Sequence, residues 1–276
     1  MIRRSFLWVM VVGLSVTVAT HSEVYGMQKW LANGVKVAQE SAAAKWCAET
    51  GGDFARWSVD SAGIAWSMLN GQMDQTAAIT ASSPILAYRM CDFVKGDSKV
   101  LELGAGHGSL SVPVARMFAE KAEPTRFDIV ECNEAFYNCL NARVAQFGKP
   151  NHEVYTYRML FGAEWKPRDI NDATGYYDTV LSTLPWTRMN ADMQRTVQER
   201  ITEVLKSKGK LIWVSLAGAK VLGAVKAAIK GDKELVEYSQ EQLYFGAWIQ
   251  ENFESVTEHF VPWNVTPMRV YVAIKK

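Results

Sequence analysis

The feature that most constrains this chain is an apolar stretch that runs directly into three alternate glycines. Residues 100–103 are followed by Gly104, Gly106 and Gly108, and an apolar helical pattern begins at Ser109. Glycine has no Cβ, so it lets the backbone turn sharply and approach a ligand closely. The pattern therefore predicts a strand, a ligand-binding loop and a helix.

An acidic residue, Glu102, lies two residues before the first glycine. Dinucleotide-binding enzymes use G-x-G-x-x-G spacing, whereas this chain has G-x-G-x-G, and a carboxylate here would repel a pyrophosphate. No P-loop lysine follows the glycines either. These observations favour a ligand that carries an ammonium and a sulfonium group. The alternative for Glu102 is a structural acid bonded to backbone amides.

A second acid, Glu131, ends the apolar stretch Phe127 to Glu131. It follows Gly108 by twenty-three residues, which is about where a Rossmann-like fold places the residue that binds a ribose. One carboxylate can accept hydrogen bonds from both ribose hydroxyls and so orient a nucleoside. The alternative is an acid favoured by the dipole of the following helix.

Apolar strand patterns and helical patterns alternate from about residue 97 onward, which predicts a parallel sheet. We expect strands at 99–103, 127–131, 152–159, 177–184 and 210–216, and helices at 109–121, 134–147 and 191–206. The last of these helices is expected to end at Lys208, Gly209 and Lys210. Two further strands at 253–261 and 268–274 predict a C-terminal hairpin.

The Glu102 to Gly108 motif and Glu131 together resemble class I S-adenosylmethionine-dependent methyltransferases. This implies an α/β Rossmann-like fold with a mostly parallel seven-stranded sheet and a C-terminal antiparallel hairpin. Three further stretches, at residues 79–84, 129–137 and 181–186, and the aromatic tail 261–272 resemble bacterial phospholipid (phosphatidylethanolamine) N-methyltransferases. Those enzymes share features with rRNA adenine dimethylases.

The resemblance implies a binding site for S-adenosylmethionine. Its cofactor-binding residues would be Glu102, Gly104, Gly106, Gly108, Glu131, Asn133, Ser82, Ser83 and Gly162. The glycines would hold the methionine end, Glu131 the ribose, and the two serines would close over the cofactor. Relatives often have Gly-Asp-Ala near the adenine, where this chain has Gly162 after Phe161, so either residue is only a candidate neighbour of the adenine.

The segment Leu184, Pro185 and Trp186 is implied to line the acceptor pocket and is our catalytic assignment. The Trp186 ring could stabilise the positive charge that grows on an amine by cation–π contact, or it could be a packing residue. No general base can be named. Adenine methyltransferases have an Asn or Asp before their Pro-Pro-Tyr sequence, which this chain lacks.

The first twenty residues differ from the rest. Arg3 and Arg4 precede fifteen uncharged residues, 6–20, which as a helix would cover about 22 Å against about 30 Å of hydrocarbon. We expect residues 1–25 to be an anchor or signal-like segment and 26–75 a tryptophan-rich helical region, either at the membrane or as a cap. The methyltransferase domain would be residues 76–276.

Composition limits the partners. The net charge is +1, so there is no global field to attract nucleic acid. Cys132 and Cys139 are expected on one helical face as core contacts, and no metal site is expected.

The leading hypothesis is methylation of an amine, namely the ethanolamine headgroup of a phospholipid, by a membrane-associated protein whose catalytic domain faces the cytoplasm. The alternatives are a membrane-anchored protein-lysine methyltransferase, an rRNA adenine dimethylase-like enzyme, and an inactive cofactor-binding or assembly protein.

Overall fold

A seven-stranded sheet forms the centre of the protein. The computed structural model describes residues 83–186, 189–216, 244–261 and 267–276. The expected segments 1–25 and 26–75 lie outside these residues. The strands are β1 (Lys99–Leu103), β2 (Thr125–Glu131), β3 (His152–Arg158), β4 (Tyr177–Ser182), β5 (Leu205–Leu216), β6 (Phe253–Val261) and β7 (Met268–Lys275).

The strand order is β3-β2-β1-β4-β5-β7-β6. The first five strands in this order are parallel, and β7 runs antiparallel between β5 and β6. This confirms the predicted mostly parallel sheet with a C-terminal antiparallel hairpin. The carboxyl ends of β1, β2 and β4 therefore meet at one edge, which is where ligands bind in open α/β sheets.

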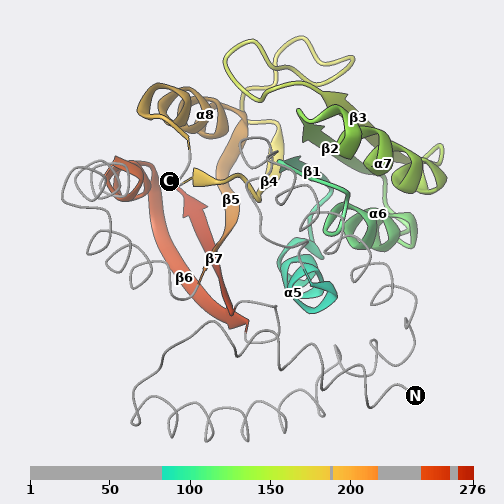
Figure 1. Cartoon of the computed structure of the whole chain (residues 1–276), viewed down its shortest axis with the longest axis horizontal. Coiled ribbons are helices and arrows are strands. Elements are labelled where there is room, and N and C mark those ends of the chain that lie inside the picture. Colours follow the sequence, from blue (N-terminus) through green and yellow to red (C-terminus); the bar gives the residue numbers. More distant parts are fainter. Residues whose placement is uncertain (1–82, 187–188, 217–243, 262–266) are drawn as a thin grey trace, which may run out of the picture.

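Helices cover both faces of the sheet (Figure 1). One core lies between the sheet and α5 (Pro84–Val94), α6 (Ser111–Ala119) and α7 (Glu134–Val144). The other lies under α8 (Ala191–Val204) and a helical segment at residues 244–252, and it includes Trp165, Trp213 and Trp248. The glycine loop joins β1 to α6 at the boundary between these layers.

A buried ion pair holds the long connection between β3 and β4. The fully buried Asp128 accepts hydrogen bonds from Arg126 Nε and Nη2, at 2.7 and 3.1 Å, and from the hydroxyls of Tyr157 and Tyr177, both at 2.7 Å. Arg126 also donates to the carbonyl of Arg168 at 2.8 Å. Burial, aided by Asp128, raises the pKa of both tyrosines, so they remain donors. A buried charge needs such partners, and here they fix a segment that has no helix of its own.

The expectations for two regions, the end of α8 with the start of β5 and the pair of Cys132 and Cys139, were wrong. The helix predicted to continue to residue 206 ends at Val204, and the strand predicted from 210 already begins at Leu205. The pairing of β5 with β4 shifts register between residues 205 and 210. Leu205 pairs with Tyr177, and Lys210 pairs with Thr179. Gly209 therefore belongs to a bulge in a strand instead of ending a helix. Cys132 is exposed and precedes α7, and Cys139 is only partly buried, so they are not paired core contacts.

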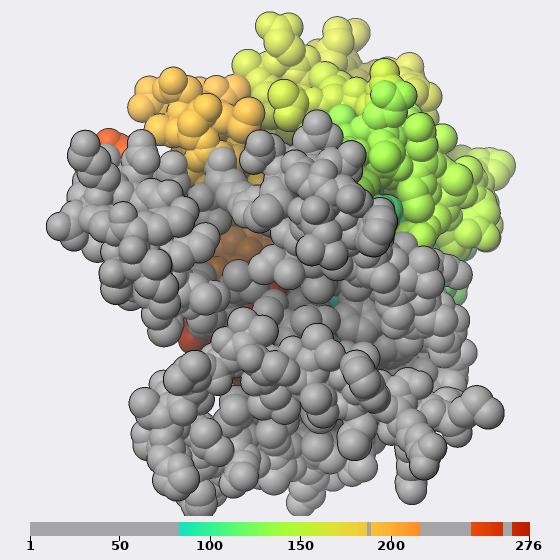
Figure 2. Space-filling model, in the orientation of Figure 1, coloured from blue at the N-terminus to red at the C-terminus, as the bar shows by residue number. Residues whose placement is uncertain are grey.

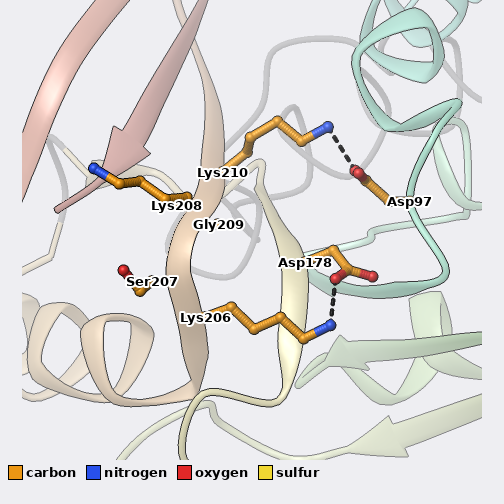
Figure 3. A pocket seen from close by; sticks show the side chains of 7 residues that line it. All are labelled: Asp97, Asp178, Lys206, Ser207, Lys208, Gly209 and Lys210. Atoms are coloured by element: carbon orange, nitrogen blue, oxygen red, sulfur yellow. Dashed lines mark hydrogen bonds and ion pairs between the residues drawn. The ribbon is translucent and has the colours of Figure 1, made fainter.

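The bulge lines a cavity of about 160 Å³ at the amino ends of β1, β4 and β5 (Figure 3). Its charges are paired: Lys210 with Asp97 at 2.8 Å and Lys206 with Asp178 at 2.5 Å. Asp178 also accepts from the backbone N–H groups of Ser98 and Lys99, and although burial opposes its ionisation, these partners lower its pKa. These paired charges connect the starts of β1, β4 and β5, at the end of the sheet opposite to the glycine loop.

We expect Gly209→Ala to lower the free energy of unfolding by about 1 to 3 kcal/mol, as overpacking does. A Cβ at this position would lie 2.8 Å from the Lys206 carbonyl oxygen and 3.2 Å from that of Asp178. Gly96→Ala is the control, because nothing lies within 4 Å of its Cβ position. Urea unfolding measures both variants. Equal stabilities would show that the bulge can yield.

Candidate functional site

Three glycines with positive φ form the loop after β1. The φ angles are 76° at Gly104, 56° at Gly106 and 87° at Gly108, in the region that side chains disfavour. The Gly104 N–H donates to the carbonyl of Val130 on β2 at 2.9 Å, which extends the strand pairing into the loop. The loop is therefore fixed at the edge of the sheet.

The three glycines differ in what surrounds them. The Cβ position of Gly104 lies 3.0 Å from Leu184 Cδ2, and that of Gly108 lies 2.9 Å from Leu140 Cδ1. No atom of the described residues lies within 4 Å of the Cβ position of Gly106. Two glycines thus allow close packing, and the described residues leave space at the middle one where a ligand could approach the backbone.

Glu131 braces this loop. One carboxylate oxygen accepts the N–H of Gly106 and the other accepts the N–H of Asn133, each at 2.7 Å. A carboxylate has about four acceptor positions, so two remain for further donors. The contact to the middle glycine was not foreseen from the sequence. The ribose role of Glu131 stays a prediction, now with an acid held in place by two backbone amides.

Asn133 caps α7. Its side-chain oxygen accepts the N–H of Phe136 at 3.1 Å, which satisfies one of the free amides at the helix start. Its contact with the site runs through its backbone N–H to Glu131. Cofactor contact by the Asn133 side chain stays a prediction.

Glu102 lies on β1 with its side chain fully buried, and neither carboxylate oxygen has a hydrogen-bond partner among the described residues. Burial raises its pKa to about 8; the hydroxyl of Ser111 on α6 lowers it without reaching hydrogen-bond geometry, and Glu131 raises it. The alternative considered for Glu102, a structural acid bonded to backbone amides, finds no such amide among the described residues. Its carboxyl group is mostly neutral at pH 7.

The two serines that are expected to close over the cofactor directly precede α5 in the sequence. Ser83 caps α5, where its hydroxyl accepts the N–H of Leu86 at 3.2 Å. Ser82 lies outside the described residues. Closure of these serines over a ligand stays a prediction.

The segment after β4 lies against the glycine loop. Leu184 Cδ2 lies 3.0 Å from the position that a Cβ on Gly104 would occupy. The Thr183 hydroxyl donates to the Gly104 carbonyl at 2.6 Å. The indole of Trp186 is only 7% exposed and lies 4.9 Å from the ring of Phe245 and 6.2 Å from that of Trp248, between centroids. Leu184 is therefore the member of the predicted acceptor segment that meets the loop. Trp186 is packed among aromatic rings.

Gly162 lies in the connection between β3 and β4. Its Cβ position is 3.5 Å from Thr196 Cγ2 on α8, and the neighbouring Phe161 packs on Trp165 with ring centroids 5.1 Å apart. Figure 2 shows this connection, in yellow, beside α8 in orange. The Gly162 carbonyl also accepts the N–H of Trp165 at 3.0 Å. These contacts hold the connection in place, and the adenine role of both residues stays a prediction.

Sequence reasoning missed three residues that shape the loop. Thr183 bonds to the carbonyl of Gly104, and Ser111 faces Glu102 from the first turn of α6. Arg143 on α7 donates to the carbonyl of His107 within the loop at 2.9 Å. Of these three residues, only Thr183 could have been found from the sequence. It directly follows a central parallel strand, and the carboxyl end of such a strand is where α/β sheets bind ligands.

The described part of the chain has no group of His, Cys, Asp and Glu side chains arranged to hold a metal ion. None of the helices in residues 83–186, 189–216 and 244–261 combines the length and apolar character needed to cross a bilayer. The uncharged segment 6–20 lies outside these residues.

No family model and no curated protein sequence matches this chain. Solved methyltransferase structures resemble it at low identity. The magnesium protoporphyrin IX methyltransferase of Synechocystis, with bound S-adenosylhomocysteine, shares 14% identity over 70% of this chain and 83% of its own, with a TM-score of 0.49. The precorrin-6y C5,15-methyltransferase of Geobacter metallireducens shares 13% over 69% and 88%, with a TM-score of 0.44.

The methyltransferase domain of the citrinin polyketide synthase shares 11% identity over 64% of this chain, with a TM-score of 0.42, and this chain spans only 46% of its length. The sheet order, with β7 antiparallel between β5 and β6, is itself that of the class I methyltransferase fold.

The stability of this protein should depend on pH through Glu102. Its pKa is about 8 when folded and 4.5 when unfolded, so the unfolded chain loses this proton first as the pH rises. The contribution of the Glu102 proton to the free energy of unfolding is therefore fully present below pH 4.5. It is lost as the pH rises toward 8, which lowers the free energy of unfolding by on the order of 4 kcal/mol. Glu102→Gln should remove this loss and exceed the parent at pH 8.

Urea unfolding of both proteins at pH 5 and pH 8 measures the effect, because the other titrating groups cancel in the difference. Glu120→Gln, at an exposed glutamate, is the matched control. If the difference between Glu102→Gln and the parent were the same at both pH values, Glu102 would not carry the buried proton.

Proposed function

We propose that this protein is an S-adenosylmethionine-dependent methyltransferase that methylates an amine, most specifically the ethanolamine headgroup of a phospholipid at a membrane surface. The observation that carries the methyltransferase assignment is the group of Glu102, Gly106 and Glu131 at the carboxyl edge of a sheet with class I order. The acceptor assignment depends on the sequence resemblance.

The residues present suit S-adenosylmethionine. Gly106 leaves room at the loop for a ligand to approach the backbone. Glu131 is held by two amides and keeps free acceptor positions for vicinal hydroxyls. Glu102 is a buried carboxyl group that has no hydrogen-bond partner among the described residues, which suits an ammonium group. When bound, the cofactor supplies an electrophilic methyl group on a sulfonium.

The protein's own part is positioning and exclusion of water. Thr183 ties the segment after β4 to the Gly104 carbonyl, so Leu184 is fixed against the loop. Gln194 Nε2 donates to the carbonyl of Trp186 at 2.7 Å and to that of Met189 at 3.1 Å, which fixes the following turn. An apolar Leu184 beside the loop favours an uncharged amine, the form that can act as nucleophile.

No histidine is assigned as a base. Among the described residues, His152 bonds to Thr125 at the amino end of the sheet, and His259 packs on Phe93. Only His107 lies in the glycine loop, where its ring packs on Phe136 with centroids 4.2 Å apart. A neutral amine needs no base before attack, so this arrangement fits an amine acceptor.

Membrane association is part of the proposal. It is supported by the uncharged segment 6–20 behind two arginines and by the excess of basic over acidic residues in the first 46 positions. The cofactor is made inside cells, so we propose a cytoplasmic catalytic domain.

Incubation of the full-length protein with methyl-labelled S-adenosylmethionine and vesicles of phosphatidylethanolamine should label the lipid. Phosphatidylcholine vesicles, whose headgroup nitrogen is already quaternary, are the control. Label on protein would favour a lysine methyltransferase, and label on RNA would favour an adenine dimethylase. Cofactor binding without any transfer would favour an inactive binding protein and overturn the proposal.

Gly106→Ala should lower the affinity for S-adenosylhomocysteine at least tenfold, which is about 1.4 kcal/mol, because its methyl group would occupy the open space of the loop. Gly175→Ala is a matched control: the φ of Gly175 is 58° against 56° at Gly106, and no described atom lies within 4 Å of its Cβ position either. Both variants should lose about 1 kcal/mol of stability from the left-handed backbone.

Calorimetry measures binding, and thermal unfolding measures stability. Equal affinities for the two variants would show that the ligand does not approach the backbone at Gly106.

A further inference from the structure

Two neighbouring polar side chains next to the glycine loop, Glu102 on β1 and Ser111 on α6, are buried without hydrogen-bond partners among the described residues. Both oxygens of Glu102 and the hydroxyl of Ser111 are fully buried and make no hydrogen bond among the described residues. Buried polar groups are nearly always satisfied, and each exception calls for an explanation. Two such groups facing each other beside a candidate ligand loop point to a ligand group that would satisfy them.

Among the described residues, no cation near Glu102 could balance a charge on its carboxylate. Leu181 of β4 and Ile129 of β2 flank it in the sheet. Cys91 on α5 faces it, and burial, together with Glu102, keeps that thiol protonated by raising its pKa. Glu131 on β2 is a like charge, and Arg116 on α6, which acts on Cys91, donates to Tyr88 instead.

A carboxylate in this position would be an uncompensated buried charge, which costs several kcal/mol, so it takes up a proton instead. The pKa of about 8 reflects this preference for the protonated form. A cation that bound at the glycine loop would favour the ionised form instead. The start of α6 would help, since Ser111 can donate its hydroxyl to an ionised Glu102 and a helix N-terminus favours negative charge.

We propose that Glu102 is protonated in the ligand-free protein and gives its proton to solvent when the ammonium group of the cofactor binds, with Ser111 as the residue that positions the resulting carboxylate. The proton balance is simple: the carboxyl group loses one proton to water, and the ammonium keeps its own protons and donates hydrogen bonds to the carboxylate. This inference rests on the proposed cofactor, S-adenosylmethionine.

The consequence is that the affinity for the cofactor depends on pH. Below the pKa of Glu102, binding must displace a proton, so the association constant should rise about tenfold per pH unit and level off above pH 8. A ligand with ribose and adenine but no ammonium group, such as 5′-methylthioadenosine, should bind without this dependence.

Calorimetric titration of the full-length protein with S-adenosylhomocysteine, in buffers of different ionisation enthalpy, counts the protons released. Near pH 7 we expect about one proton released per ligand bound. The Glu102→Gln variant should release none and should bind with a flat pH profile. The difference between the two proteins cancels any titration of the ligand itself. Ser111→Ala should shift the rising part of the profile to higher pH.

The outcomes separate the two proposals. Binding with no proton released by the parent protein, or with equal release by parent and Glu102→Gln, would overturn the proton exchange and leave the cofactor assignment intact. Absence of binding heat in every buffer, with no shift in thermal unfolding, would overturn the cofactor assignment itself. Equal proton release with 5′-methylthioadenosine would place its origin away from the ammonium group.

Discussion

The hydrogen bonds of Glu131 hold the ligand edge of this protein together. Its two oxygens accept the amides of Gly106 and Asn133, so one side chain connects the end of β2, the middle of the glycine loop and the start of α7. A loop of three glycines has high conformational entropy, and it keeps one shape only when something outside it fixes the backbone. Thr183 and Arg143 add two more such bonds, to the carbonyls of Gly104 and His107.

The two ends of the sheet differ in whether their ionisable side chains have partners. At the amino ends, each lysine or aspartate in the pocket of Figure 3 has a partner, including Lys208 with Glu254. At the carboxyl ends, Glu102 is buried with no partner among the described residues. Paired charges stabilise little but fix geometry, whereas an unpaired buried carboxyl group costs stability. A fold keeps such a cost where a ligand can remove it, and this is the edge where α/β sheets bind ligands.

The sequence predicted the elements whose patterns are local. Strands 99–103 and 253–261 have the expected bounds, and the first acid and the glycines lie where the motif implied. The start of β5 was missed because Gly209 looks like the end of a helix, whereas the bulge it forms depends on pairing with Tyr177 and Thr179 some thirty residues away. The Arg126–Asp128 network was missed for the same reason, since Tyr177 joins it from another strand.

Burial explains both the proposed cofactor half and the proposed acceptor half of the site. Glu102 stays neutral because the low-dielectric interior disfavours its charge, and the same effect beside Leu184 would lower the pKa of an amine and leave it uncharged. An uncharged amine is the nucleophile that methyl transfer requires. In our proposal, Glu102 loses its proton when the cofactor binds, so the cofactor ammonium would differ from such an amine in having the Glu102 carboxylate as a partner. One fold can thus keep one amine charged and make its neighbour reactive, according to whether a buried carboxyl group faces it.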